Sequence, residues 1–287
     1  MKDAKLTLKQ SAKHQTVVQL NQDVAIGGQD IIIIGGPCAV DTQAQLETIA
    51  AHLNRSIQAL RGGVYKPRTS PYSFQGVGSN GLEILTSVRD RTGMPVVTEV
   101  MAIHQIAGMV EAGVDMLQVG SRNMQNFDLL KALGEIQTPV LLKRGLSATL
   151  EEFVMAAEYI MAHGNPNVVL CERGIRSFDT YTRNVLDLGV VVALKQLTHL
   201  PVIVDPSHAA GRRDLIAGLS RAAIACGADG LIIECHPEPD KAISDAQQTL
   251  SLPEMQELVQ SLKPIAVAVG RSMVEGDRVN LKQLIAV

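Results

Sequence analysis

Residues 31–39 read Ile-Ile-Ile-Ile-Gly-Gly-Pro-Cys-Ala, and this stretch sets the pattern for the rest of the chain. Four consecutive isoleucines without polar alternation are typical of a strand that is buried on both faces of a parallel sheet. Two glycines and a proline then end the apolar run, and a cysteine follows. Residues 42–60 continue with apolar side chains at helical spacing, so the local unit is a strand followed by a helix.

The same strand-and-helix unit recurs along the whole sequence, and several of its helical segments end at a glycine, as helices often do. The predicted strands are Ile31–Ile34, Gly63–Tyr65, Pro95–Thr98, Met116–Val119, Val140–Leu142, Val168–Leu170, Val202–Val204 and Leu231–Ile233. The predicted helices are Thr42–Leu60, Gly81–Thr92, Ile103–Glu111, Phe127–Gly134, Leu150–His163, Val185–Leu197, Arg212–Cys226 and Pro253–Leu262. This alternation predicts an α/β fold of the (β/α)8 TIM-barrel type. A doubly wound open sheet is the alternative, although it usually needs fewer units.

The segments outside this repeat are short. Two small apolar runs, Val17–Leu20 and Val24–Ile26, predict an N-terminal hairpin that closes the floor of the barrel. We therefore expect an N-terminal extension over residues 1–30 and a catalytic barrel over residues 31–287. The residues after Pro264 are expected to form a final element that packs on the barrel.

Composition excludes several classes of function. The chain has 287 residues, of which 46% are hydrophobic and 19% charged, and its net charge is −3, so no overall field favours nucleic acid or a membrane surface. Tryptophan is absent and aromatic residues make up 3%, which argues against a stacking surface for nucleic-acid bases. No apolar run reaches the roughly 18 residues of a membrane span. The N-terminus lacks the apolar core of a signal peptide, and the four cysteines form no C-x-x-C pair. Reduced thiols and a cytoplasmic location are therefore expected.

In a barrel of this kind the chemistry lies at the carboxyl ends of the strands. Cations gather at the predicted strand ends, with Arg61 just before the second strand, and in an acidic chain this many cations indicate an anionic ligand with more than one phosphate. They are Arg61, Lys66, Arg68, Arg122, Lys143 and Arg173. A second group, Cys38, His208 and Glu234 with Asp205 or Asp245, offers the donors of a divalent-metal site.

Each member of the second group also has a simpler explanation. Cys38 taken alone is better explained as a small buried hydrophobic residue, and His208 as a hydrogen-bonded loop residue. Glu234 is harder to dismiss, because it directly follows an apolar strand where an unpaired carboxylate is costly. The other cysteines, Cys171, Cys226 and Cys235, are assigned to packing, and His104 and His236 to structural or surface positions.

These segments closely resemble 3-deoxy-arabino-heptulosonate 7-phosphate (DAHP) synthase, in its shorter type I beta form. The matching stretches run in order across the predicted barrel. They are Gly35–Cys38, Arg61–Gly76 (RGGVYKPRTSPYSFQG), Gln118–Phe127 (QVGSRNMQNF), Leu142–Gly145, Cys171–Asp179 (CERGIRSFD), Asp205–His208 and Glu234–Asp245 (ECHPEPDKAISD). The run Lys66-Pro67-Arg68-Thr69-Ser70 is the most telling. The related 3-deoxy-manno-octulosonate 8-phosphate synthase family carries a Lys-Ala-Asn-Arg type of run there, which favours erythrose 4-phosphate over arabinose 5-phosphate as the substrate.

The resemblance implies a role for each matching residue. Cys38, His208, Glu234 and Asp245 are implied as metal ligands, with Asp205 as a partner of His208. Arg61, Lys66, Arg122, Lys143 and Arg173 are implied to bind phosphoenolpyruvate. Arg68, Thr69 and Ser70 are implied to contact erythrose 4-phosphate. Asp245 enters through this match and not through the pattern of residues.

The resemblance also implies a reaction: metal-dependent condensation of phosphoenolpyruvate with erythrose 4-phosphate, the first step of the shikimate pathway to aromatic amino acids. The expected metal is Mn2+, with Fe2+, Co2+ or Zn2+ as alternatives. Lys66 is expected to donate a proton to the former aldehyde oxygen, which requires neighbouring arginines to lower its pKa. A homodimer or homotetramer is expected. Feedback control by aromatic amino acids is not expected, because roughly thirty residues before the barrel are too few for an amino-acid-sensing domain.

Three rival functions stay open at this point. The octulosonate synthase would use arabinose 5-phosphate at the same kind of site. A non-catalytic phosphate-binding barrel would bind phosphoenolpyruvate without releasing phosphate. A metal-independent aldolase would form a Schiff base with a lysine such as Lys143.

Overall fold

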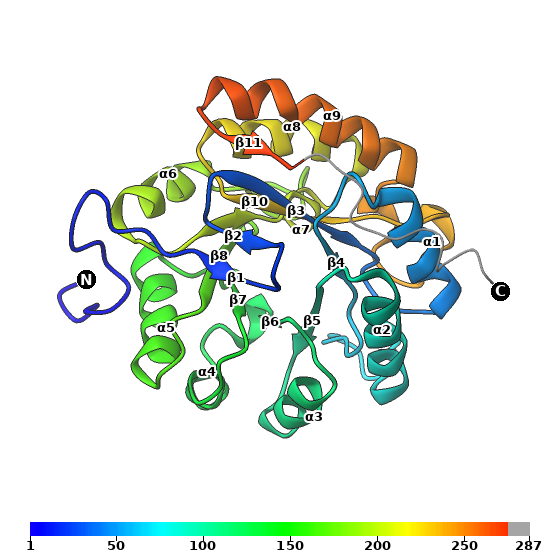
Figure 1. Cartoon of the computed structure of the whole chain (residues 1–287), viewed down its shortest axis with the longest axis horizontal. Helices are drawn as coiled ribbons and strands as arrows, with labels where there is room; N and C mark the ends of the chain where they lie inside the picture. Colours follow the sequence, from blue (N-terminus) through cyan, green and yellow to red (C-terminus); the bar gives the residue numbers. More distant parts are fainter. Residues whose placement is uncertain (275–287) are drawn as a thin grey trace.

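The chain forms a closed barrel of eight parallel strands with helices around it (Figure 1). The structure is a computed structural model that describes residues 1–274. The barrel strands are β3 (Asp30–Gly36), β4 (Ala59–Arg61), β5 (Val96–Val100), β6 (Met116–Val119), β7 (Val140–Lys143), β8 (Val168–Glu172), β9 (Val202–Val204) and β10 (Gly230–Glu234). Each strand pairs with the next in parallel, and β10 pairs with β3 to close the ring. The predicted (β/α)8 barrel is confirmed.

One helix follows each strand and covers the outside of the barrel (Figure 1). These helices are α1 (Gln43–Leu53), α2 (Ser79–Thr92), α3 (Ile106–Glu111), α4 (Phe127–Gly134), α5 (Leu150–Ala162), α6 (Leu188–Leu197), α8 (Arg213–Ala225) and α9 (Leu252–Ala268). A short additional helix, α7 (Pro206–Ala210), begins directly after β9. Four 3-10 turns complete the elements: η1 (Ile103–Gln105), η2 (Ser121–Asn123), η3 (Pro239–Lys241) and η4 (Ala246–Gln248). Over residues 1–274, no helix is long and apolar enough to cross a membrane.

The predicted hairpin is present and plugs the floor of the barrel. Strands β1 (Val18–Gln19) and β2 (Ala25–Ile26) pair in antiparallel fashion. Their buried side chains, with those of Leu20 and Val24, join the apolar residues that point into the barrel, such as Ile34. Figure 1 shows the hairpin lying across this end of the barrel. The floor is therefore closed by apolar contacts. The division into residues 1–30 and 31–287 stays a prediction.

The second strand was predicted at the wrong place. The structure has β4 at Ala59–Arg61, whereas the sequence indicated Gly63–Tyr65, and α1 ends at Leu53, before the predicted end at Leu60. Apolar spacing alone does not separate a very short buried strand from the last turn of a helix. Pairing with both neighbouring strands decides the outcome, and it places Arg61 on the strand itself.

Two other helices also depart from the expected bounds. Helix α6 begins at Leu188 because Asp187 caps it, while Val185 forms an isolated bridge with Ile175. Helix α9 continues through Pro264 to Ala268, although an internal proline usually breaks a helix. Leu262 and Ala266 stay buried on either side of this proline, so packing overrides the local preference. The expected final element is the short strand β11 (Ser272–Met273), which pairs with β3; residues 275–287 of the tail lie outside the described residues.

Candidate active site

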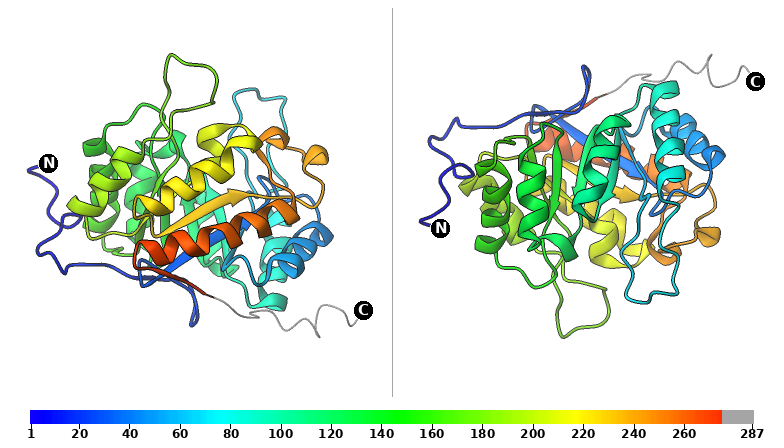
Figure 2. Two further views of the ribbon diagram at one scale, coloured as in Figure 1. Left: turned by 90° about the horizontal axis from the view of Figure 1, so that it is seen from above. Right: turned by 90° about the horizontal axis from the view of Figure 1, so that it is seen from below.

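A cavity of about 510 Å³ opens at the carboxyl ends of the barrel strands. Two long loops, residues 66–78 after β4 and 173–187 after β8, rise on the face opposite the hairpin (Figure 2). Cationic and polar side chains dominate the lining. Ten of the predicted site residues line it: Arg61, Lys66, Arg68, Thr69, Ser70, Arg122, Lys143, Arg173, His208 and Asp245. The two others, Cys38 and Glu234, are buried beside it.

The four predicted metal ligands come together from separate parts of the chain. One donor atom from each of Cys38, His208, Glu234 and Asp245 lies within 4.8 Å of all the others. His208 Nε2 is 3.3 Å from Glu234 Oε1 and 4.0 Å from Asp245 Oδ2. Cys38 Sγ is 3.0 Å from Asp245 Oδ2. A thiol, an imidazole and two carboxylates at this spacing fit a divalent transition-metal ion.

His208 is oriented by the residue that begins its helix. Asp205 caps α7 by accepting a hydrogen bond from the His208 backbone N–H at 2.9 Å, and Pro206 occupies the first helical turn. The same carboxylate contacts His208 Nδ1 at 2.7 Å, which leaves Nε2 directed at the cluster. Burial works to raise the pKa of Asp205, but His208 and Lys143 beside it hold that pKa well below its usual range. Asp205 therefore contacts His208 in the way that the resemblance implies.

Glu234 is held as a carboxylate at the end of β10. Arg61 Nη1 donates to its Oε1 at 2.6 Å, and Gln248 Nε2 donates to its Oε2 at 2.7 Å. Burial opposes ionisation, but His208 and Arg61 outweigh it and lower the pKa of Glu234 to about 2. Burial also lowers the pKa of His208, which favours the neutral imidazole that a metal requires.

Cys38 lies directly after β3 and its thiol is buried. Lys66 Nζ donates to Cys38 Sγ at 2.9 Å and to the Cys38 carbonyl oxygen at 3.0 Å. Burial and the nearby Glu234 raise the pKa of the thiol to about 12 in spite of Lys66. Binding of a metal by this sulfur would therefore release a proton, as is usual for a cysteine ligand.

Asp245 has an unusual backbone conformation. Its φ of 56° is the only positive value of a non-glycine residue over residues 1–274. Aspartate tolerates this left-handed region better than most residues, although the region is sparsely populated. The turn directs the side chain towards Cys38 and His208. No local sequence signal reveals this, which is why the spacing alone left Asp245 undecided.

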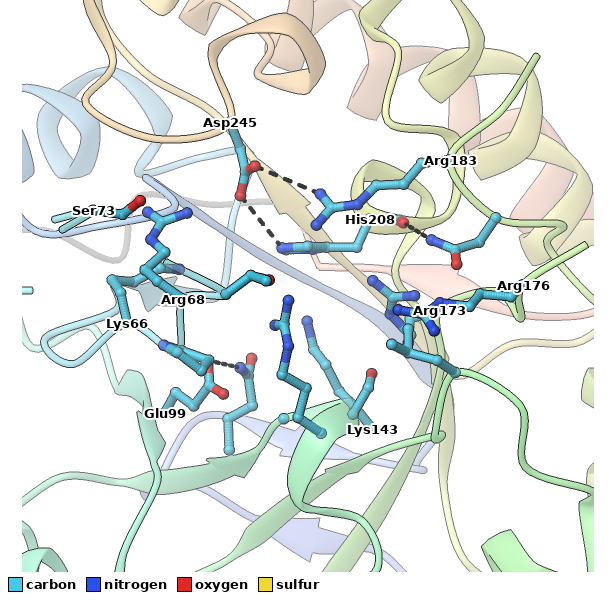
Figure 3. Close-up of a pocket in the computed structure, with 18 of the residues that line it drawn as sticks. Lys66, Arg68, Ser73, Glu99, Lys143, Arg173, Arg176, Arg183, His208 and Asp245 are labelled. Atoms are coloured by element: carbon cyan, nitrogen blue, oxygen red, sulfur yellow. Dashed lines mark hydrogen bonds and ion pairs between the residues drawn. The ribbon is translucent and has the colours of Figure 1, made fainter. Parts of the chain in front are cut away.

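Some cations on the cavity wall have no acidic partner. Arg61 is paired with Glu234, and Lys143 is paired with Asp205. In contrast, Arg122, Arg173 and Arg176 make no ion pair with a carboxylate anywhere in the described part of the chain. Figure 3 shows Arg173 and Arg176 on one side of the cavity, facing Lys66 and Arg68 on the other. Burial lowers the pKa of Arg173, which is the cost of holding an unpaired cation there. The cations on this wall can therefore bind an anion.

The loop after β4 carries the residues expected to hold the second phosphate. Arg68 Nε donates to the carbonyl oxygen of Phe74 at 3.2 Å, and its Nη2 donates to Ser244 Oγ. Thr69 and Ser70 follow it at the cavity rim. The loop therefore presents a guanidinium and two hydroxyl side chains from one short segment.

The pKa of Lys66 differs from the expected direction. Burial and Arg61 do work to lower it, but Cys38, Glu99 and Glu234 together raise it above its usual value. The expectation that neighbouring arginines would lower this pKa is therefore wrong, because acidic groups surround the ammonium as well. Lys66 stays a cation that can hold an anion, and it can still protonate an alkoxide, which is a stronger base than an amine, so the lowered pKa is not required for that role.

Sequence reasoning missed several residues of the cavity wall. They are Ser73, Glu99, Gln118, Arg176, Arg183 and Asn184. Gln118 Nε2 donates to Glu99 at 3.3 Å. Gly120 leaves room for this carboxylate, since a Cβ there would lie 2.1 Å from Glu99 Oε1. The unusual length of the segment 173–187 between strand and helix was the available signal for Arg176 and Arg183.

Comparison with known proteins gives a consistent result. Residues 15–269 match the DAHP synthetase I family. A phospho-2-dehydro-3-deoxyheptonate aldolase of Thermotoga maritima is 49% identical over 94% of this chain and 80% of its own. A 2-dehydro-3-deoxyphosphooctonate aldolase of Syntrophotalea carbinolica is 32% identical over 86% of this chain and 95% of its own. A crystal structure of the Thermotoga DAHP synthase superposes with a TM-score of 0.90 at 47% identity, covering 96% of this chain and 80% of that chain.

Proposed function

The chain belongs to the DAHP synthetase I family, and we propose that it joins phosphoenolpyruvate to erythrose 4-phosphate, giving 3-deoxy-arabino-heptulosonate 7-phosphate and inorganic phosphate. This would be the first step of the shikimate pathway. The observation that carries the proposal is one cavity with a four-donor cluster on one side and, on the other, arginines that no carboxylate of the described residues neutralises. The cluster suits a metal bound next to an aldehyde, and the arginines suit an enol phosphate.

The cationic side is proposed to bind phosphoenolpyruvate. Arg122 and Arg173 have no carboxylate partner among residues 1–274, so an incoming phosphate or carboxylate would supply a counter-charge that these residues do not. Lys143 and Arg61 are proposed to complete the set from positions where Asp205 and Glu234 already orient them. Such prearranged donors stabilise negative charge as it develops on the phosphate that leaves.

The four-donor cluster is proposed to hold the metal. A divalent ion bound by Cys38, His208, Glu234 and Asp245 would supply Lewis-acid polarisation of the aldehyde oxygen. Mn2+ is our first choice; Fe2+, Co2+ and Zn2+ are alternatives, since a mixed set of sulfur, nitrogen and oxygen donors does not select one of them.

The chain's own groups are proposed to position the carbon atoms and move the protons. The methylene carbon of phosphoenolpyruvate is nucleophilic and bonds to the aldehyde carbon, while water adds to the carbon that bears the phosphate. Lys66, charged and close to the cluster, is proposed to protonate the former aldehyde oxygen. The hemiketal phosphate then expels inorganic phosphate towards the arginines. Lys143 is ion-paired with Asp205, which argues against its use as a free Schiff-base nucleophile.

The loop after β4 is proposed to select the acceptor. Arg68, Thr69 and Ser70 would bind the phosphate of erythrose 4-phosphate from the rim of the cavity. The octulosonate synthase activity on arabinose 5-phosphate is the second candidate, and relatives with that name share about a third of their residues with this chain. The greater identity to the heptulosonate enzyme favours the four-carbon acceptor.

The oligomeric state, the location in the cell and the domain boundary stay predictions. A homodimer or homotetramer is proposed from the resemblance to the family. A cytoplasmic location is proposed because all four cysteines are free thiols. A catalytic barrel over residues 31–287 with an extension over residues 1–30 is proposed because the hairpin contributes to the floor and not to the cavity lining.

The deciding experiment measures phosphate release from phosphoenolpyruvate with each acceptor. Erythrose 4-phosphate should support release, arabinose 5-phosphate should not, and a chelator should abolish it until Mn2+ is restored. Preference for arabinose 5-phosphate would show that the chain has the octulosonate synthase activity instead. Full turnover after metal depletion would refute the role of the cluster.

A further inference from the structure

The end of the loop between β8 and α6 lies against the helix that carries His208. The backbone N–H groups of Arg183 and Asn184 donate to the carbonyl oxygens of Ala210 and Ala209 at 2.9 and 2.8 Å. Asn184 Nδ2 donates in addition to the carbonyl oxygen of His208 at 2.9 Å. These bonds pin the loop to α7 and place the Arg183 side chain beside the cluster.

Arg183 reaches the two carboxylates of the cluster by different routes. Its Nη1 lies 3.5 Å from Asp245 Oδ1, the oxygen that does not face Cys38 (Figure 3). The same nitrogen donates to Gln248 Oε1 at 3.2 Å, and Gln248 Nε2 donates to Glu234 Oε2 at 2.7 Å. The side chain of Gln248 is fully buried, so this link is held in place.

We propose that Arg183 is a positioning residue for the metal centre. Together with Asn184 it contacts three of the four clustered residues: His208, Asp245 and, through Gln248, Glu234. Asp245 depends on it most, since this carboxylate stands on a turn of sparsely populated backbone conformation. Fixing the outer oxygen of a ligating carboxylate keeps its inner oxygen directed at the metal.

The positive charge of Arg183 makes the proposal testable, because charge and orientation predict opposite changes in metal affinity. A cation this close repels a divalent ion, so charge by itself predicts that removing the guanidinium strengthens metal binding. Orientation predicts the opposite, because partners of metal ligands typically contribute about 10- to 100-fold in affinity. The sign of the change in metal affinity therefore separates the two effects.

The loop provides a matched control. Arg176 lines the same cavity from the same loop but, within the described structure, makes no hydrogen bond or ion pair with any of the four residues. Arg176→Gln removes the same charge without touching the proposed support. Arg183→Lys keeps the charge, but both contacts come from the terminal nitrogen Nη1, and the lysine ammonium stands on a side chain one atom shorter, so it cannot reach Asp245 and Gln248 in the same geometry.

The test titrates the metal-depleted full chain and its variants with Mn2+ and measures free Mn2+ by electron paramagnetic resonance. Arg183→Gln should weaken binding about 10- to 100-fold, Arg183→Lys by less, and Arg176→Gln not at all. Activity of Arg183→Gln should recover as Mn2+ is raised. The Arg183 side chain is 39% exposed, so both variants should fold, and thermal melting checks this.

Unchanged or tighter Mn2+ binding by Arg183→Gln would overturn the proposal, as would equal losses in Arg183→Gln and Arg176→Gln. If the thermal midpoint of Arg183→Gln is lowered, the Mn2+ affinity of Arg183→Lys is the deciding measurement. Wild-type affinity in Arg183→Lys would also overturn the proposal. The inference rests on the proposed function only in that the cluster binds a metal. Since the readout is metal affinity, its failure leaves the choice of acceptor sugar untouched.

Discussion

The two ends of the barrel are built from opposite kinds of residue. The floor is closed by apolar side chains such as Val18 and Ile26, which are fully buried against residues inside the barrel. The mouth is lined by arginines, lysines and carboxylates from nearly every strand end. The same eight strands reach from the floor to the mouth, so the contrast between apolar and charged residues arises from the residue types at the two ends of each strand. It indicates that stability and chemistry are located separately in this fold.

The largest effect is expected at the mouth, for Cys38→Ala. Loss of the thiol ligand should remove the metal and slow turnover by on the order of 10³-fold, because polarisation by a metal is worth several kcal/mol. The thermal midpoint should stay close to that of the parent protein. Metal analysis and steady-state kinetics check this, and a variant with wild-type metal content would disprove the ligand assignment.

The next effect belongs to the floor. Ile26→Ala should lower the free energy of unfolding by about 2–5 kcal/mol, since it deletes fully buried methylene and methyl groups. The activity of the protein that remains folded should be unchanged. Denaturant unfolding with kinetics at low temperature measures both. Normal stability with lost activity would break the separation between the two ends.

Arg173→Ala tests the unpaired cations. We expect kcat/KM for phosphoenolpyruvate to fall about 10- to 100-fold, the value of a charge-assisted hydrogen bond or two. The thermal midpoint should stay the same or rise, because the variant removes a buried cation that lacks a carboxylate partner in the described residues. Kinetics and thermal melting report the two quantities. A marked loss of stability would mean that Arg173 is structural.

Arg68→Ala tests the assignment of the two phosphates. The KM for erythrose 4-phosphate should rise about 10-fold, whereas the KM for phosphoenolpyruvate should change much less. Initial rates with each substrate varied in turn measure both constants. The reverse pattern would exchange the two sites, and equal changes would argue for a general effect of the loop.

The smallest effect concerns Glu158, which anchors the N-terminal arm away from the mouth. Its carboxylate accepts hydrogen bonds from the backbone N–H groups of Lys5 and Leu6 at 2.8 Å and of Thr7 at 2.9 Å. Burial opposes ionisation, but these bonds lower the pKa of Glu158 below its value in the unfolded chain. The stabilisation, about 1 kcal/mol, is therefore complete above the unfolded pKa and is lost as the pH falls through the folded one.

Hydrogen exchange of residues 5–7 should detect this loosening at acidic pH, and Glu158→Gln should show it already at pH 7. Activity at neutral pH should be unchanged in the variant. Exchange that does not depend on pH would show that other contacts hold the arm.

Much of the mouth was predictable from sequence because strand ends are local features. Glu234 follows an apolar run directly and Cys38 follows one after Gly-Gly-Pro, and both lie in the cluster. The resemblance to one family supplied Asp245, which spacing left undecided. Arg183 was missed because its importance comes from neighbours that are distant in sequence, such as Gln248. The direction of the Lys66 pKa was wrong for the same reason, since Glu99 and Glu234 reach it only after folding.

The sequence by itself determined the alternation of strands and helices, the closed floor and the types of residue available at the mouth, because periodicity and strand-end chemistry are written along the chain. Only the tertiary structure decided that the second strand is Ala59–Arg61, which carried Arg61 into contact with Glu234. It also decided which cations form ion pairs with carboxylates in the described part of the chain and which do not. Strand pairing and charge pairing join residues that are far apart in the chain, so their outcome depends on where folding places both partners.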